Sequence, residues 1–128
     1  FRNIHRHQVI TQSELVSIRM DESLSFLNIS SLNEFIIQEV SNNQVLKHVI
    51  VNCSSVSNID LSALETLIDI NDELYKLGIK LHFSEVKGPV MDKLRRSSLI
   101  EHLHGQIFLT HYQAVAALKY ELDNYIQI

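Results

Sequence analysis

The stretch from His48 to Cys53 constrains the fold more than any other part of the chain. Its centre, Val49-Ile50-Val51, is a continuous run of β-branched residues with no polar side chain to face water. Runs of this kind are typical of an interior strand in a parallel sheet, where other elements cover both faces. The stretch therefore predicts the central strand of an α/β domain.

A helix is predicted after this strand and a polar loop. Ser62 and Glu65 have the spacing of a capping box, in which the two side chains satisfy free amides at a helix start. Apolar residues then recur at spacings of four and three, at Ala63, Leu67, Ile70, Leu74 and Leu77. Gly78 suits the C-terminal cap, and residues 79–84 predict the next strand.

The residues before the central strand predict a hairpin and a shorter helix. Apolar and polar residues alternate over residues 15–20, which favours a half-buried strand. A second strand through residues 24–27 would pair with it as a hairpin. Ser31 and Glu34 form another capping-box pattern, so we expect a helix from there to about residue 42.

The last third of the chain predicts two more helices and an edge strand. Pro89 suits the first turn of a helix, because that turn lacks amide partners in any case. Residues 107–109 form a short apolar segment that would add an edge strand. Thr110 and Gln113 make a third capping box, and the buried stripe of the helix behind it would be Val115, Leu118, Leu122 and Ile126.

Together these elements predict one α/β domain with a mixed, mostly parallel central sheet, an N-terminal β-hairpin and about four flanking helices. Strands separated by helices need crossover connections, which make the later part of the sheet parallel. A length of 128 residues fits a single core.

Composition and motifs argue against several classes of function. A net charge of −4 is unfavourable for nucleic-acid binding, which needs clustered Lys and Arg. The single Cys53 follows an apolar run and is expected to be a buried thiol. None of the seven His residues has the helical pairing of zinc hydrolases, and no phosphate loop or nucleophile elbow is present. We therefore expect no enzyme, no metal and no cofactor; a small hydrolase built on the His residues is the minor alternative.

The polar loop between the central strand and the best-predicted helix is the candidate site. Ligands of open α/β sheets bind at the carboxyl ends of strands, and amides at a helix start attract anions. The candidate residues for binding a partner or ligand are Ser54, Ser55, Asn58, Asp60, Leu61 and Ser62. Local capping and turn formation would account for the same residue types equally well.

The chain begins with basic residues: Arg2, His5, Arg6 and His7 have no acidic residue among them. This segment is either a solvated tail or a stretch that lies near an anionic membrane surface. The chain also lacks an initiating Met, so we expect it to be a piece of a longer protein.

The order of elements and four stretches of sequence resemble the STAS domain. These stretches are Phe1–His7, Asp21–Phe26, Asn58–Glu65 and, most specifically, Glu85–Ser97. STAS domains occur in anti-sigma-factor antagonists and at the cytoplasmic C-terminus of SulP-type sulfate and anion transporters. The segment Glu85–Ser97 is similar to the bacterial transporter branch.

The resemblance implies a non-catalytic regulatory or interaction domain of a sulfate (anion) transporter. Residues 1–12 would be the juxtamembrane connector, with residues 1–7 at the membrane surface, and residues 13–128 the STAS domain. It would lie on the cytoplasmic side of the inner membrane. Its partners would be the transmembrane part of the same transporter and an intracellular protein or small anionic or nucleotide ligand, with the full-length protein a homodimer.

The alternative is a free-standing signalling protein of the anti-sigma-factor-antagonist type. Such proteins are switched by phosphorylation of a Ser or Thr directly after a conserved Asp, and that position is Leu61 here. A side chain without a hydroxyl accepts no phosphate, so only the neighbouring Ser62 would remain as a phosphorylation site.

Overall fold

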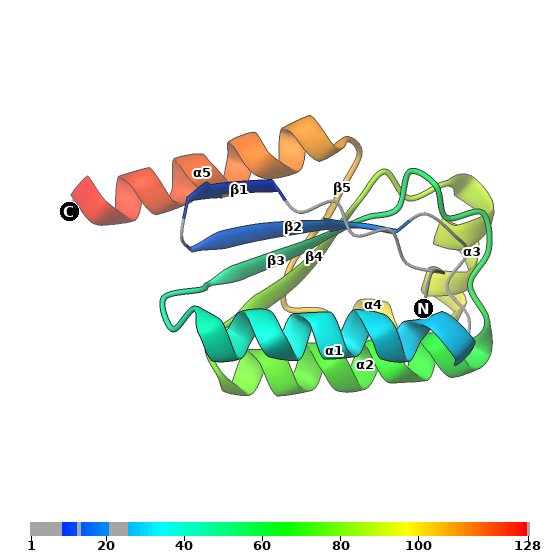
Figure 1. Cartoon of the computed structure of the whole chain (residues 1–128). Coiled ribbons are helices and arrows are strands. Elements are labelled where there is room, and N and C mark those ends of the chain that lie inside the picture. The colour runs from blue at the N-terminus through cyan, green and yellow to red at the C-terminus, as the bar shows by residue number, and fades with distance from the viewer. Residues whose placement is uncertain (1–8, 13, 21–25, 128) are drawn as a thin grey trace.

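The computed structural model describes residues 9–12, 14–20 and 26–127. These residues form a five-stranded sheet with helices on both faces (Figure 1). The strands are β1 (Val9–Gln12), β2 (Leu15–Arg19), β3 (His48–Asn52), β4 (Lys80–Ser84) and β5 (Ile107–Phe108). The helices are α1 (Phe26–Asn42), α2 (Leu61–Lys76), α3 (Gly88–Arg96), α4 (Leu99–His102) and α5 (His111–Gln127). None of the helices in these ranges has the length and apolarity to cross a bilayer.

The strands are hydrogen-bonded in sequence order, so β3 is the middle strand, as predicted. β1 is antiparallel to β2, and all the later pairs are parallel. In the centre of the sheet, Val49 of β3 is aligned with Val16 of β2 and Leu81 of β4. The predicted α/β class with a mixed, mostly parallel sheet is confirmed.

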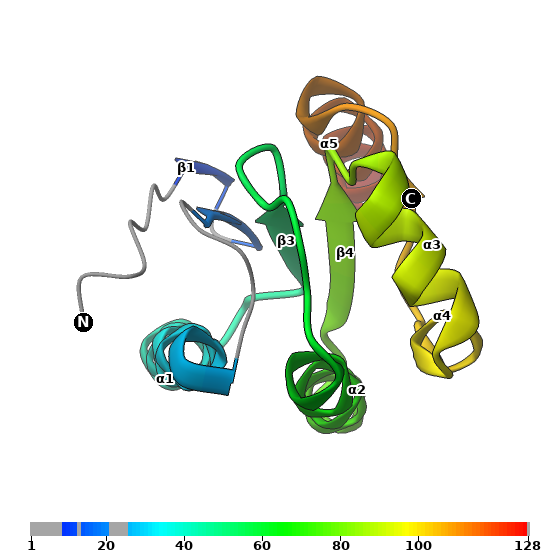
Figure 2. The same ribbon diagram turned by 90° about the vertical axis from the view of Figure 1, so that its right-hand side faces the viewer.

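The sheet separates two helical layers of unequal size. Each new strand is added on the same side of the last, and crossover connections share one hand, so successive crossover helices lie on the same face. α1 and α2 cover that face, and α5 lies on the other (Figure 2). The larger core, under α1 and α2, includes Val16, Val49, Val51, Leu67 and Phe83. The smaller core, under α5, is built from Leu15, Ile50, Ala114 and Leu118.

The N-terminal hairpin exists, but it uses different residues from those predicted. Its partner strand is β1, which precedes β2, and the predicted strand at residues 24–27 is not formed: residues 21–25 lie outside the described part, and Phe26 begins α1. The helix starts before Ser31 because buried Ile29, Leu32 and Ile36 already recur at helical spacing. The Ser31–Glu34 pattern therefore lies inside α1 and caps nothing.

Strand β2 is buried on both faces, which corrects its prediction as half-buried. Ser17, predicted to lie on the polar side, is 2% exposed because α5 covers it. Its hydroxyl is 2.9 Å from Nε2 of His111 at the start of α5. Arg19, predicted on the same side, is exposed.

Helix α5 follows its prediction where its side chains are described. Thr110 Oγ1 accepts a hydrogen bond of 3.1 Å from the amide of Gln113, as the capping pattern predicts. Leu118 is buried and Val115 packs beside it. The side chains of Leu122 and Ile126 lie outside the described part of the helix.

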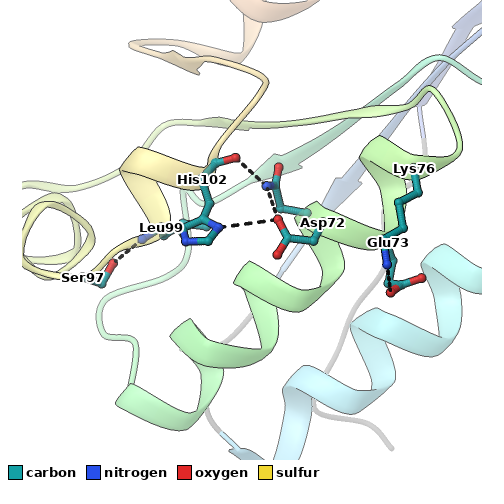
Figure 3. A network of polar contacts seen from close by, with 7 residues as sticks. Asp72, Glu73, Lys76, Ser97, Leu99 and His102 are labelled. Carbon is teal, nitrogen blue, oxygen red and sulfur yellow. Dashed lines mark hydrogen bonds and ion pairs between the residues drawn. The ribbon is translucent and has the colours of Figure 1, made fainter.

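The four-residue helix α4 was not predicted, and with it the described residues form five helices, where about four were expected. A single turn is too short to show helical periodicity in the sequence. Asn71, buried in α2, holds it: Asn71 Nδ2 donates to the carbonyl oxygen of His102 at 2.7 Å. Asp72 Oδ1 lies 3.6 Å from His102 Nδ1 (Figure 3), so two neighbouring residues of α2 contact the end of α4.

Candidate functional site

The candidate loop leaves the carboxyl end of the central strand. Asn52, the last residue of β3, is aligned with Arg19 and Ser84, so three parallel strands end at the same edge of the sheet. The next residue, Cys53, is buried, and its amide donates to the carbonyl oxygen of Ser84 at 2.8 Å. The loop is therefore anchored to the sheet at its first residue.

Short-range hydrogen bonds hold the first half of the loop. Asn52 Oδ1 accepts from the amide of Ser54 at 2.9 Å, and Cys53 carbonyl oxygen accepts from the amide of Val56 at 3.0 Å. Val56 is fully buried, whereas Ser54 and Ser55 are half-buried in the turn. These contacts show that the first half of the loop has a defined local structure.

The second half of the loop caps α2, but through a different residue from the one predicted. Asp60 has extended backbone angles, and its Oδ1 accepts from the amide of Ala63 at 2.8 Å. Asp60 is thus the N-cap, because it satisfies an amide that has no partner within the helix. Ser62 is already the second helical residue, so the predicted capping box at Ser62 and Glu65 is wrong.

Leu61 and Ser62 are exposed at the start of α2. The Leu61 side chain is 68% exposed, whereas that of Ile59, two residues before it, is buried. Ser62 is also exposed, and the free amides of this first turn give the start of α2 a partial positive charge. Three of the predicted positions are therefore exposed, Asn58, Leu61 and Ser62, and of these Leu61 and Ser62 lie side by side.

A lysine from another helix joins the loop, and the sequence reasoning missed it. Lys93 in α3 donates from Nζ to Asn58 Oδ1 at 2.5 Å and to the carbonyl oxygen of Ile59 at 3.1 Å. Lys93 follows Asn58 by 35 positions and Ile59 by 34, so no local sequence pattern connects them. The one available signal was that the Glu85–Ser97 segment, which contains Lys93, carries the most specific family resemblance.

The loop, the first turn of α2 and the end of α3 enclose a shallow pocket of about 270 Å³. Its apolar wall is made by Ile59, Leu61 and Leu64, and its polar wall by Lys93, Arg96 and Ser97. An apolar wall beside two cations and a helix start suits a partner that presents an apolar group next to a negative charge. Of the predicted residues, only Leu61 lines this pocket.

The predicted site residues therefore fall into two groups. Asn58, Asp60, Leu61 and Ser62 come together around the start of α2, and Lys93 holds the Asn58 end. Ser54 and Ser55 lie in the turn nearer the sheet, and neither contributes to the lining of the pocket.

A Ser, His and Glu cluster under the start of α5 has the residue types of a hydrolase, but not its geometry. His111 Nδ1 is 2.9 Å from Ser84 Oγ, while Glu85 accepts from the backbone amide of His111 rather than from its ring. Ser17 and Ser84, whose hydroxyls contact the ring, are at most 2% exposed. Burial lowers the pKa of His111, although Glu85 acts in the opposite direction. The cluster is an interior hydrogen-bond network that fixes α5 to the sheet.

A second buried hydrogen-bond network contains a pair of histidines, one on β3 and one on β4. His48 Nδ1 and His82 Nε2 are 2.9 Å apart, and His82 Nδ1 accepts from the amide of Gln106 at 3.0 Å. Burial lowers the pKa of His82 to about 3, with smaller contributions from His48 and Lys80. Burial also raises the pKa of Cys53 to about 12, so this thiol is protonated at neutral pH.

Among the described residues, the exposed histidines His102 and His104 lie elsewhere and have local partners. The His104 ring stacks on Tyr75 with centroids 3.5 Å apart, and His102 faces Asp72. In the parts of the chain that the structure describes, no three metal-ligating side chains come close enough to hold an ion.

Comparison with protein families gives a match over most of the chain. The model of the STAS domain matches residues 6–114. Sulfate transporter 3.2 of Arabidopsis thaliana is 33% identical over 133 residues, which cover 95% of this chain and 21% of that protein. The chain thus spans about a fifth of the length of this curated relative.

Solved structures share the fold at lower identity. The STAS domain of a SulP transporter from Vibrio cholerae superimposes with a TM-score of 0.75 at 18% identity, covering 90% of this chain and 88% of that one. The anti-sigma factor antagonist SpoIIAA of Bacillus, unphosphorylated, gives 0.66 at 16% identity over 90% of this chain and 98% of that one. At such identities these likenesses establish the fold alone.

Proposed function

The chain belongs to the STAS domain family, and from that membership we propose that it is the regulatory, non-catalytic C-terminal domain of a SulP-type sulfate transporter. The observation that carries this proposal is the alignment of 95% of the chain with one fifth of a plant sulfate transporter. The rest of such a protein would contain the membrane part that moves the anion. The domain would couple that movement to conditions inside the cell.

In this proposal the first partner of the domain is the transmembrane part of the same transporter. Val9–Gln12 form β1 of the sheet, so within residues 1–12 those before β1 would connect the two parts. The basic residues among 1–7 would lie against anionic lipid on the cytoplasmic side of the inner membrane. The full-length transporter would be a homodimer.

The second partner would bind at the pocket beside Leu61. Lys93 and Arg96 supply positive charge, and exposed Leu61 supplies an apolar contact, so an intracellular protein or small anionic ligand with a neighbouring apolar group fits best. Because Lys93 also holds Asn58 and Ile59, a ligand that draws Lys93 away would release the loop. That exchange of contacts is a route by which binding would alter the domain.

Ser62 is the proposed position of modification at the same site. It is exposed and does not form the N-cap, so a phosphate there would leave the Asp60 hydrogen bond to Ala63 in place. A dianion in the first turn of a helix is electrostatically favourable.

The first test is to read the gene upstream of the codon for Phe1. Segments of about 20 apolar residues ending shortly before Arg2 would support the transporter proposal. A start codon within a few residues of Phe1 would contradict it and favour the free-standing, anti-sigma-factor-antagonist-like signalling protein.

The regulatory role needs a separate measurement on the full-length protein. Sulfate uptake would be compared among the native transporter, the variant Lys93→Ala/Arg96→Ala and the control Lys119→Ala, whose exposed lysine lies on α5 away from the pocket. We expect uptake to change only in the double variant, at equal amounts of protein in the membrane. Equal uptake by all three, and by a transporter that lacks the domain, would contradict a regulatory role.

A further inference from the structure

A second and larger hollow lies between α1 and α2, and its lining residues belong to these two helices or directly follow them. α1 and α2 run side by side beneath the sheet (Figures 1 and 2). The hollow has a volume of about 370 Å³, within the range of about 300–1,000 Å³ that is usual for ligand pockets. Apolar residues dominate its lining, among them Ile36 and Val40 of α1 and Ile70 and Leu74 of α2.

Large apolar side chains at its border are left in contact with water. Ile37 is 54% exposed, and Leu77 is 62% exposed at the end of α2. A groove between two helices with apolar side chains on both walls is the surface into which a third helix packs, with its ridge of side chains between theirs.

The two helices that form the groove carry a strong negative charge. α2 contains Glu65, Asp69, Asp72 and Glu73 against the single base Lys76, and α1 contains two Glu and no base. Their net charge is therefore −5, whereas that of the whole chain is −4. The negative charge of this protein is concentrated in the layer that holds the groove.

The carboxylates are also placed where they face an occupant. Asp69 and Glu73 line the hollow itself, one turn apart on α2. Glu73 lies 3.4 Å from Lys76, but both side chains are more than 70% exposed, and surface pairs of this kind contribute little. The groove lies along the C-terminal halves of both helices, where the helix dipoles add further negative potential.

We propose that the α1–α2 groove binds an amphipathic, basic helix of a partner protein. The apolar ridge of that helix would fill the space between Ile37 and Leu74, and its Lys or Arg residues would face Asp69 and Glu73. The proposal rests on this groove alone and does not depend on the assignment to a transporter.

The same charges disfavour the other candidates for the groove. A second copy of this chain would bring its own acidic groove against this one, because a two-fold interface pairs identical surfaces. An anionic membrane surface or a small anion would be repelled by Asp69 and Glu73.

The test uses the 128-residue chain and three synthetic 18-residue peptides. The first has Leu on one helical face and Lys beside it, the second has Glu in place of Lys, and the third is a scramble of the first without an apolar face. Fluorescence anisotropy of the labelled peptides gives the Kd. We expect the basic amphipathic peptide to bind at least about tenfold more tightly than the other two, and more weakly as salt rises. Failure of the basic peptide to bind, or equal binding of the acidic one, would overturn the proposal.

Matched variants then locate the binding. Ile37→Gln and Asp69→Asn/Glu73→Gln change exposed or lining residues of the groove, and each should weaken binding about fivefold or more. Leu109→Gln and Glu101→Gln change exposed residues outside the groove and should leave the Kd unchanged. Equal effects of both sets would show non-specific attraction to an acidic protein and would overturn the proposal.

Sedimentation tests whether a second copy of the chain occupies the groove instead. If the chain dimerises and the variant Ile37→Gln does not, the occupant is a second copy, and the proposal is overturned.

Discussion

His82 donates from Nε2 to Nδ1 of His48 across 2.9 Å inside the sheet. The direction of this bond follows from the amide of Gln106, which occupies Nδ1 of His82 and leaves the ring proton on Nε2. The arrangement requires His82 to be neutral, since a second proton would have to displace the Gln106 amide. The pair therefore couples the protonation of one buried side chain to the connection between β4 and β5.

The pH dependence of stability follows from this pair. The pKa of His82 is about 3 in the folded chain and about 6.5 when exposed, so the unfolded chain binds more protons between these values. His82 therefore does not reduce the free energy of unfolding above about pH 6.5, and it reduces it progressively as the pH falls from there toward 3. Between pH 7 and pH 5 the free energy of unfolding should fall by about 2 kcal/mol through His82. Urea unfolding at both pH values measures the difference.

The variant His82→Leu isolates this contribution. It should be less stable than the native chain at pH 7, because His48 and Gln106 lose their partner. Between pH 7 and pH 5, however, its free energy of unfolding should fall by about 2 kcal/mol less than that of the native chain. Leu109→Gln, at an exposed residue without a titratable group, should keep the native pH dependence. An unchanged pH dependence in His82→Leu would show that another group is responsible.

Gly105 is expected to tolerate no side chain. A Cβ atom there would lie 1.9 Å from the carbonyl oxygen of Leu81 and 2.8 Å from Nδ1 of His82, so backbone would have to move. Gly105→Ala should cost about 1–3 kcal/mol in thermal or urea unfolding. Gly88→Ala is the control, since its Cβ would meet nothing within 4 Å, and its effect should stay within about 0.5 kcal/mol.

Asp60 and Ser62 should differ in how much they stabilise the start of α2. Asp60→Ala should reduce the free energy of unfolding by about 1 kcal/mol, because the amide of Ala63 loses its acceptor. Ser62→Ala should change it by less than about 0.5 kcal/mol, since Ser62 is exposed and already helical. Chemical denaturation of the two variants compares them directly, and a larger cost for Ser62→Ala would restore the capping-box interpretation.

The Lys93 contact predicts a change in dynamics rather than in global stability. Lys93→Met removes the donors to Asn58 and Ile59, so the amides of residues 54–60 should exchange with deuterium several-fold faster. Amides of β3 should exchange at the native rate. Lys87→Met, an exposed lysine just before α3, provides the control, and equal loop exchange in both variants would contradict a tethering role for Lys93.

Cys53 is predicted to be unreactive in the folded protein. Its thiol is buried and its pKa is raised to about 12, so almost no thiolate forms at neutral pH. A disulfide reagent such as Ellman's should modify it only after unfolding in urea. Rapid modification without denaturant would mean that the start of the loop opens readily.

The parts of the fold that local patterns determine were predictable from the sequence. β3 and α2 have uninterrupted apolar patterns, and both lie where they were predicted. The start of α1 was not, because the Ser31–Glu34 pattern resembles a cap and outweighed the earlier periodicity from Ile29. Capping-box spacing is only three residues long, so it also arises inside helices.

The candidate site was predictable only in its local half. Asp60 and its neighbours follow a strand and precede a helix, an order that the sequence contains. Lys93 enters from α3, and Ser17 meets His111 across 94 positions, so packing alone decides both contacts. Ser17 illustrates the difficulty, since a hydroxyl that alternates with apolar residues has the same pattern whether water or an imidazole satisfies it.

The sequential order of the strands also affects how the chain acquires its structure during translation. Every strand pairs with the one made just before it, so β2, β3 and β4 with α1 and α2 can assemble as they leave the ribosome. α5 follows these elements in the chain, and until it docks, the sheet face with Leu15, Ile50 and the two buried histidines remains open. A nascent chain would therefore carry an unfinished apolar surface until α5 is complete.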